Sequence, residues 1–192
     1  MGYDLYWDEE PVEVLTAQME MRATDYDRDA SAAWTAAQQK HVSYWRENVW
    51  GMGGFRAVLL SVDAIDDTIG VDIEPDVPDE GDKPSTRRFQ CNSGWWVTPD
   101  QCKAIATKLL DAIGNGELET LAFVKATGRY GNADDKALDV GRAIVAMFGD
   151  VGKTALVHMP DLDELESCAE QIVRMVKFFR GAGEHGNGIR VW

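Results

Sequence analysis

The sequence predicts an α+β protein that is mostly helical and has a small antiparallel sheet. Two helix starts with capping residues at the right spacing, Thr98 and Asp161, indicate long helices. Alternating side chains in Gly2–Trp7 and an apolar end, Ile189–Trp192, indicate strands at both ends of the chain. We expect these two strands to join one sheet with a third short strand, Gly94–Val97.

The first half of the chain is predicted to contain a helical hairpin. Val12–Thr24 has apolar residues at helical spacing, and Ala30–Trp50 is rich in Ala and Gln with a second apolar face. Gly51–Gly54 is predicted to end this second helix, because glycine is common at helix ends and also lets other groups approach the backbone closely. Phe55–Val62 then resumes as a short apolar helix.

An acidic segment follows these helices. Asp63–Asp82 contains nine acidic residues with scattered Ile and Val. We therefore expect an exposed connector or insertion loop at about residues 63–88 within a single domain, 1–192. Its spacing does not fit an EF-hand, so the sequence predicts no metal site.

Two helices in the second half have well-defined starts. Thr98 is placed to cap Pro99–Ile113, and Gln101 completes a capping box with it. Asp161–Arg180 is predicted as the other helix, and Gly181 is expected to end it.

The segment between these helices gives weaker patterns. Leu118–Thr127 is apolar and is compatible with either a helix or a strand. After a loop, Lys136–Phe148 is predicted to be helical, and Thr154–Met159 is predicted to be a buried strand.

The composition limits the function classes. With 33 acidic and 19 basic residues the net charge is −14, which argues against direct nucleic-acid binding. The three cysteines, Cys91, Cys102 and Cys168, form no CxxC pair, so we expect a reducing cytoplasm rather than a disulfide scaffold. The N-terminus does not resemble a signal peptide, and no run is long enough for a membrane span.

Catalytic motifs are weak. Gly152-Lys153-Thr154 lacks the upstream glycine and the strand–loop–helix order of a phosphate loop. His41 and His158 lie in apolar contexts, whereas His185 lies in a glycine-rich loop and is the one histidine we would test for proton transfer. No cofactor is predicted, and whether the protein is an enzyme stays open.

The aromatic residues are the best indication of a binding site. Tryptophan and arginine are enriched at binding hot spots, and tryptophan can stack on a nucleobase. The alternative is that these rings fill the core. Alternation along Gly94–Val97 places one of Trp95 and Trp96 inward and the other outward. The clustered residues are Trp45, Trp50, Trp95, Trp96 and Trp192, with Arg46 and Arg56 nearby.

Three stretches together resemble a pattern found in uncharacterised proteins of actinobacteria and their phages. They are MGYDLYW, YWRENVWGMGGFR (Tyr44–Arg56), and NSGWWVTPDQC with the terminal KFFRGAGEHGNGIRVW. Asn187 interrupts the Gly-Gly that usually closes the pattern. The resemblance implies no known activity. It implies one cleft formed by Arg46, Asn48, Trp50, Asn92, Gly94 and Trp95. We expect a cytoplasmic protein, in the cytoplasm of the host if it is phage-encoded.

Two functions from different classes follow. The first is a non-catalytic binding protein that sequesters a small nucleotide-like ligand or blocks a host protein. Its predicted ligand-binding residues are Arg46, Asn48, Trp50, Arg56, Asn92 and Trp95. The alternative is a small enzyme acting on a polar anionic substrate, with Arg46 and Asn92 as binding groups and His185 as the proton-transfer group. Self-association stays open, as does an interaction subunit whose tryptophans are all buried.

Overall fold

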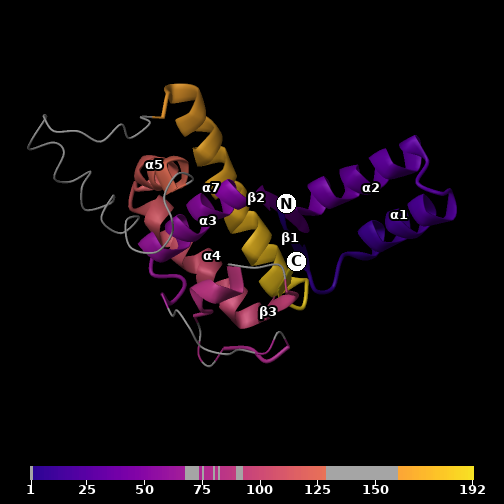
Figure 1. Ribbon diagram of the computed structural model, residues 1–192, viewed down its shortest axis with the longest axis horizontal. Coiled ribbons are helices and arrows are strands. Elements are labelled where there is room, and N and C mark those ends of the chain that lie inside the picture. Colours follow the sequence, from indigo (N-terminus) through magenta and orange to yellow (C-terminus); the bar gives the residue numbers. More distant parts are fainter. Residues whose placement is uncertain are drawn as a thin grey trace, which may run out of the picture.

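A computed structural model describes residues 2–67, 74, 76–79, 81, 83–89, 93–128 and 160–192. Helices dominate, and a four-stranded antiparallel sheet includes the strands at both ends of the chain, which confirms the predicted α+β class. The molecule has a body of sheet and helices and an arm of two helices that projects from it (Figure 1).

The sheet has the order β2-β1-β4-β3. The strands are β1 (Gly2–Trp7), β2 (Tyr44–Asn48), β3 (Trp95–Val97) and β4 (Ile189–Val191). The two terminal strands, β1 and β4, pair in the centre, with Leu5 opposite Val191. The predicted pairing of the terminal strands and of residues 94–97 is confirmed.

The two faces of the sheet differ because side chains alternate along each strand. Apart from Glu47, the inner face is apolar and largely buried, and it packs against α3 (Val49–Ser61) and α7 (Leu162–Glu184). Trp45 anchors this contact, with ring centroids 5.8 Å from Phe55 and 6.2 Å from Phe178. The outer face carries polar and aromatic side chains, namely Asp4, Tyr6, Tyr44, Arg46, Trp96 and Arg190.

The capped helices form as predicted. In α4 (Pro99–Gly114) the Thr98 hydroxyl accepts from the Gln101 backbone N–H at 3.2 Å, and the Gln101 side-chain oxygen accepts from the Thr98 N–H at 3.1 Å. In α7 the Asp161 carboxylate accepts from the Glu164 N–H at 2.8 Å. The ambiguous apolar run is the helix α5 (Leu118–Gly128).

The arm is the predicted hairpin, formed by α1 (Val12–Ala23) and α2 (Arg28–His41). The prediction of one helix over Ala30–Trp50 is wrong. Val42 adopts a left-handed conformation with φ of 53° and ends α2, after which Tyr44–Asn48 forms β2. The hydrogen bonds to β1 outweigh the helical preference of this segment.

Two glycine predictions are also wrong. Gly51–Gly54 does not interrupt a helix but lies within α3, and Gly181 lies within α7. Their role is close packing. A Cβ at Gly54 would overlap the carbonyl oxygen of Lys125 on α5, and a Cβ at Gly181 would overlap the Trp7 ring.

The acidic connector is only partly described, and its end is anchored rather than exposed. Arg88 lies in the short 3₁₀ helix Thr86–Phe89, is completely buried, and bonds to Asp79 at 2.9 and 3.0 Å. Burial raises the pKa of the Asp79 carboxyl, but hydrogen bonds from Arg88 and Ser85 outweigh it and hold that pKa below its usual range.

The predicted helix Lys136–Phe148 and strand Thr154–Met159, with His158, lie outside the described residues, as do Cys91 and Asn92. Among the described helices, none combines the length and the apolar composition that crossing a membrane requires.

Candidate functional site

The outer face of the sheet carries a row of aromatic and charged side chains across all four strands. Tyr44, Tyr6, Arg190 and Trp96 are aligned by strand register. The Tyr6 and Tyr44 ring centroids are 4.9 Å apart, and the Arg190 guanidinium lies 5.6 Å from the Trp96 ring centroid. Outward aromatic rings on a sheet are a surface on which a planar ligand can stack.

A pocket of about 490 Å³ lies where this face meets α2 and α7. We call it the sheet pocket. Its lining combines three aromatic rings, two arginines and several short polar groups. The residues are Asp4, Tyr6, Trp34, Thr35, Gln38, Gln39, Tyr44, Arg46 and Arg174.

Hydrogen bonds fix the polar side of the sheet pocket. The Tyr44 hydroxyl donates to Asp4 at 2.5 Å, and Arg46 Nε lies 3.7 Å from the same carboxylate oxygen. Burial raises the pKa of the Tyr44 hydroxyl, and the hydrogen bond and charge of Asp4 raise it further. Burial likewise raises the Tyr6 pKa, followed by the charges of Asp4 and Glu10. Both phenols therefore stay protonated at neutral pH, and the proton of Tyr44 is donated to Asp4.

Arg174 joins the sheet pocket to α7. It donates to the Tyr44 carbonyl at 3.2 Å, and its guanidinium carbon lies 5.0 Å from the Trp45 ring centroid. On the α2 side the Trp34 indole N–H is buried and has no acceptor among the described residues. Buried donors are usually paired, so Trp34 is a candidate hydrogen-bond donor for a ligand.

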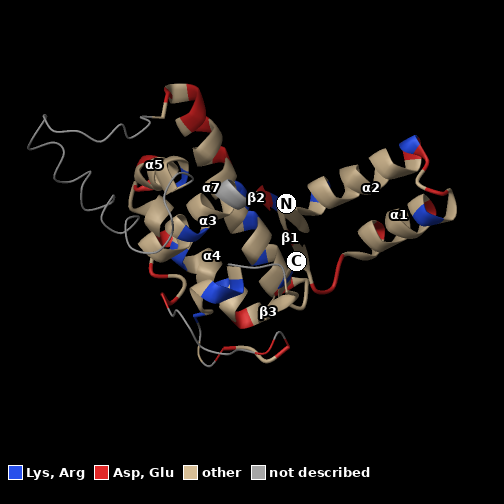
Figure 2. Cartoon of the chain, in the orientation of Figure 1, with Lys and Arg blue, Asp and Glu red and all other residues tan. Residues whose placement is uncertain are grey.

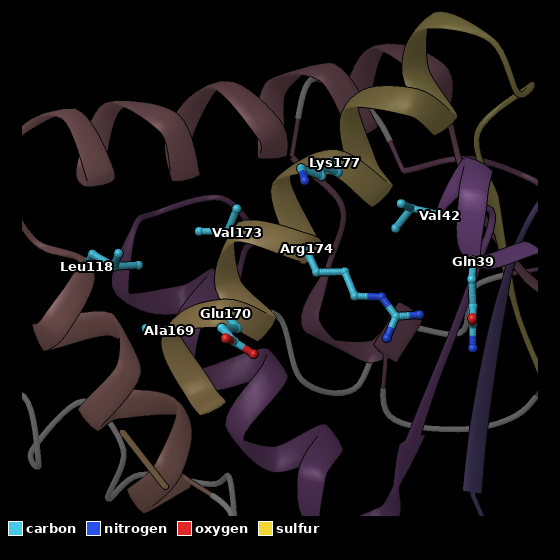
Figure 3. A pocket seen from close by; sticks show the side chains of 8 residues that line it. All are labelled: Gln39, Val42, Leu118, Ala169, Glu170, Val173, Arg174 and Lys177. Carbon is cyan, nitrogen blue, oxygen red and sulfur yellow. The ribbon is translucent and has the colours of Figure 1, made fainter. Parts of the chain in front are cut away.

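Two other pockets lie in the described part of the molecule, and one of them adjoins the sheet pocket. The helix pocket has a volume of about 600 Å³ and shares Gln39 and Arg174 with the sheet pocket, but no aromatic side chain lines it. Figure 3 shows that its side chains come from α7, from the start of α5 and from the end of α2. The corner pocket, about 570 Å³, lies between the arm and the end of α7 and is lined by His185, His41 and Arg180 among others.

Of the predicted ligand-binding residues, Arg46 lies in the sheet pocket. Asn48 instead caps α3, because its side chain accepts the Gly51 N–H at 2.7 Å. Arg56 donates to the Phe89 carbonyl at 2.9 Å. Trp50 lies in the first turn of α3, and its side chain is outside the described part.

The cleft implied by the resemblance is not formed by its described members. Arg46 is on β2 and Trp95 on β3, the two opposite edges of the sheet, roughly 14 Å apart across it. Trp95 also faces inward and is buried, while Gly94 packs under the Trp192 ring. Asn92 lies outside the described residues. The expectation that one of Trp95 and Trp96 points inward is confirmed, since Trp96 is on the outer face.

His185 and Arg46 line different pockets. His185 follows α7 and is exposed, with Nε2 3.7 Å from the neighbouring Glu184. Since a general acid or base must reach its substrate within hydrogen-bond distance, this separation gives no support for a shared reaction centre. Within the described ranges, no three His, Cys, Asp or Glu side chains are grouped so that they could hold a metal ion.

Sequence reasoning missed Tyr6, Trp34, Gln38, Tyr44 and Arg174. The alternation in Gly2–Trp7 contained the information for Tyr6, because it places Tyr6 and Asp4 on the face opposite Leu5. Tyr44 was hidden by the incorrect helix over Ala30–Trp50. Trp34, Gln38 and Arg174 reach the pocket only through the packing of α2 and α7.

Comparison of the chain with protein-family models, with curated proteins and with solved structures finds no match in any of the three. The resemblance to proteins of actinobacteria and their phages therefore stays a prediction.

Proposed function

We propose that the protein is a non-catalytic binding protein, which holds a small anionic ligand with a planar ring, of the nucleotide type, in the sheet pocket. The observation that carries the proposal is the meeting of three aromatic rings and two arginines in one pocket. We expect the sequestered ligand to be released chemically unchanged.

The ring of the ligand has two kinds of partner. Tyr6 and Tyr44 offer stacking surfaces, and such stacking contributes about 1–3 kcal/mol per base. Gln38 and Gln39, with the Trp34 N–H, supply the donors and acceptors that orient a heterocycle. These groups are uncharged, so the phosphate group must be recognised by the two arginines of the pocket.

Arg46 is the candidate for that recognition. Its side chain is 68% exposed, and its distance of 3.7 Å from Asp4 is long for a direct hydrogen bond, so the guanidinium can turn toward an anion. Arg174 adds a second positive charge at the same pocket. The N-terminal end of α7 is acidic and its later turns are basic, so the positive charge lies near the sheet although the whole chain is acidic (Figure 2).

Calorimetry tests the proposal with a panel of nucleoside mono-, di- and triphosphates and cyclic nucleotides. Arg46→Ala should weaken a binder by about 10–100-fold, because a charged hydrogen bond contributes about 1.5–3 kcal/mol. The matched control is Arg180→Ala, whose side chain is 58% exposed and lines the corner pocket. The proposal fails if no member of the panel binds, or if Arg180→Ala weakens binding and Arg46→Ala does not.

A second variant tests the charge balance of the pocket. Asp4→Asn should strengthen binding of an anionic ligand by about 3–10-fold, because it removes a negative charge from the pocket and frees Arg46. The same variant should not improve binding of an uncharged nucleoside. Equal effects on nucleotide and nucleoside would show that Arg46 does not contact the phosphate. Calorimetry at two salt concentrations measures both affinities.

The alternatives have less support. Blocking of a host protein requires a partner surface, for which the outer sheet face is available, but the described residues give no partner chemistry. The enzyme alternative depends on His185 acting beside Arg46, and these two residues line separate pockets.

A further inference from the structure

The sheet pocket continues into the helix pocket. The two pockets share Gln39 and Arg174, so they lie on either side of the same two side chains. In Figure 3 the Arg174 side chain extends from α7 toward Gln39, and Val173 and Leu118 lie on the side of Arg174 away from Gln39. A ligand held in the sheet pocket can therefore reach the helix pocket past Arg174.

The helix pocket has an aliphatic floor. Four aliphatic side chains line it, namely Val42, Leu118, Ala169 and Val173. The first three are half-buried and pack against the hydrophobic core from the other side, whereas Val173 is 39% exposed. The volume of about 600 Å³ lies within the usual range of small-molecule sites, about 300–1,000 Å³. The pocket therefore has both the surface and the room for an aliphatic group.

The charged side chains of the helix pocket concentrate its positive charge at the junction with the sheet pocket. Lys177 and Glu170 both line the helix pocket and carry opposite charges, so they balance each other. Arg174 is the remaining cation of this lining, and it is the one that the sheet pocket shares. This distribution suits an anionic group at the junction and an uncharged group beyond it. A second phosphate group in the helix pocket would instead meet the aliphatic floor and the Glu170 carboxylate.

Arg174 is held in a position to bind the anionic group. Its guanidinium donates to the Tyr44 carbonyl at 3.2 Å and lies 5.0 Å from the Trp45 ring centroid. A guanidinium carries five N–H donors, and the bond to Tyr44 is the one hydrogen bond that Arg174 makes among the described residues. The other N–H groups can bind a phosphate, for which the planar guanidinium offers two parallel donors.

We infer, on the basis of the function proposed above, that the ligand is a nucleotide that carries a small aliphatic group on its phosphate. The planar ring lies in the sheet pocket, the phosphate lies at Arg46 and Arg174, and the aliphatic group lies against Val173 and Leu118 in the helix pocket. An unsubstituted nucleotide leaves the aliphatic floor in contact with water. Burial of each methylene group there raises the affinity by a factor of about 4.

Calorimetry with two esters of the same charge tests the inference. The probes are the 5′-monophosphates of adenosine, guanosine, cytidine and uridine, together with the methyl and the isobutyl phosphate ester of each. The two esters differ only in the size of the alkyl group. The isobutyl ester should bind the wild-type chain about 10-fold more tightly than the methyl ester, because the open pocket buries part of the added aliphatic surface.

A pair of variants locates the aliphatic group. Val173→Asn should remove most of the preference for the isobutyl ester and leave binding of the methyl ester unchanged, because it makes one wall of the helix pocket polar. Leu110→Asn on α4 is the matched control, since Leu110 is 44% exposed and Val173 39%, both are helical, and Leu110 lines none of the three pockets. Circular dichroism should show the wild-type helix content for both variants, because both side chains are partly exposed.

The possible outcomes separate this inference from the proposed function. Equal affinities of the wild-type chain for the methyl and isobutyl esters overturn the inference, as does a loss of preference in Leu110→Asn that is as large as that in Val173→Asn. Binding of a monophosphate without binding of either ester also overturns it, but leaves the proposed function standing. If none of the probes binds, the proposed function fails as well.

Discussion

Replacing Lys125 by methionine should lower the free energy of unfolding by about 3–5 kcal/mol. Lys125 is completely buried on α5, and its Nζ lies 2.8 Å from a carboxylate oxygen of Glu47 on β2. Among the described residues, the methionine variant leaves the nearly buried Glu47 carboxylate with the Trp45 indole N–H, at 3.3 Å, as its hydrogen-bond donor. An unpaired buried charge is costly, and the loss is a large fraction of the stability of a typical domain. Guanidinium unfolding followed by tryptophan fluorescence measures it.

Two further variants separate loss of the ion pair from loss of packing. Lys125→Met combined with Glu47→Leu should recover most of the stability, because a buried ion pair replaced by apolar side chains is often neutral. Lys108→Met should have little effect, since Lys108 is largely exposed and lies 3.7 Å from the exposed Asp63. If the double variant is as unstable as Lys125→Met alone, loss of the Lys125–Glu47 ion pair does not cause the loss of stability.

The local parts of the fold are those that the sequence could predict. The caps at Thr98 and Asp161 depend on side chains within three residues of each other, so their geometry is contained in a short stretch. The strand pattern of Gly2–Trp7 and the apolar end of the chain likewise need no distant information. Their pairing in one sheet is confirmed, and it gives each strand a partner for its backbone hydrogen-bonding groups.

The second strand could not be predicted in the same way. Tyr44–Asn48 follows an Ala- and Gln-rich helix without a glycine or proline between them, and local preference favours continuing that helix. Val42 ends the helix instead, in a left-handed conformation that β-branched residues rarely adopt. The pairing of β2 with β1 is a tertiary contact over about forty residues, and no short pattern contains it.

The candidate site also depends on contacts between distant parts of the chain. Arg46 was expected to line the site, but in a cleft that also included Trp95. The register of the sheet places these two residues on opposite edges and opposite faces. The sheet pocket is instead closed by α2 and by Arg174 from α7. Arg174 and Tyr44 are 130 residues apart in sequence, so the contact between them depends on how α7 packs.

Replacing Gly54 by alanine should lower the free energy of unfolding by about 2–3 kcal/mol, although alanine is the better helix former by about 1 kcal/mol. Gly54 lies inside α3 where α5 crosses it, and an added Cβ would overlap the backbone carbonyl oxygen of Lys125. A backbone atom cannot turn aside as a side chain can. The two helices must therefore separate, which also strains the ion pair of Lys125 with Glu47 on the neighbouring strand.

Gly114→Ala is the matched control for this variant. Gly114 is also helical, at the end of α4, but a Cβ added there would meet no described atom within 4 Å, so this change should leave stability unchanged or raise it by up to about 1 kcal/mol. The same guanidinium titration measures both variants. If the free energy of unfolding falls in Gly54→Ala and does not fall in Gly114→Ala, close helix packing explains the glycine at position 54. A neutral Gly54→Ala would mean that α3 and α5 can move apart at little cost, and that Lys125 is held by its charge partner rather than by the crossing of the two helices.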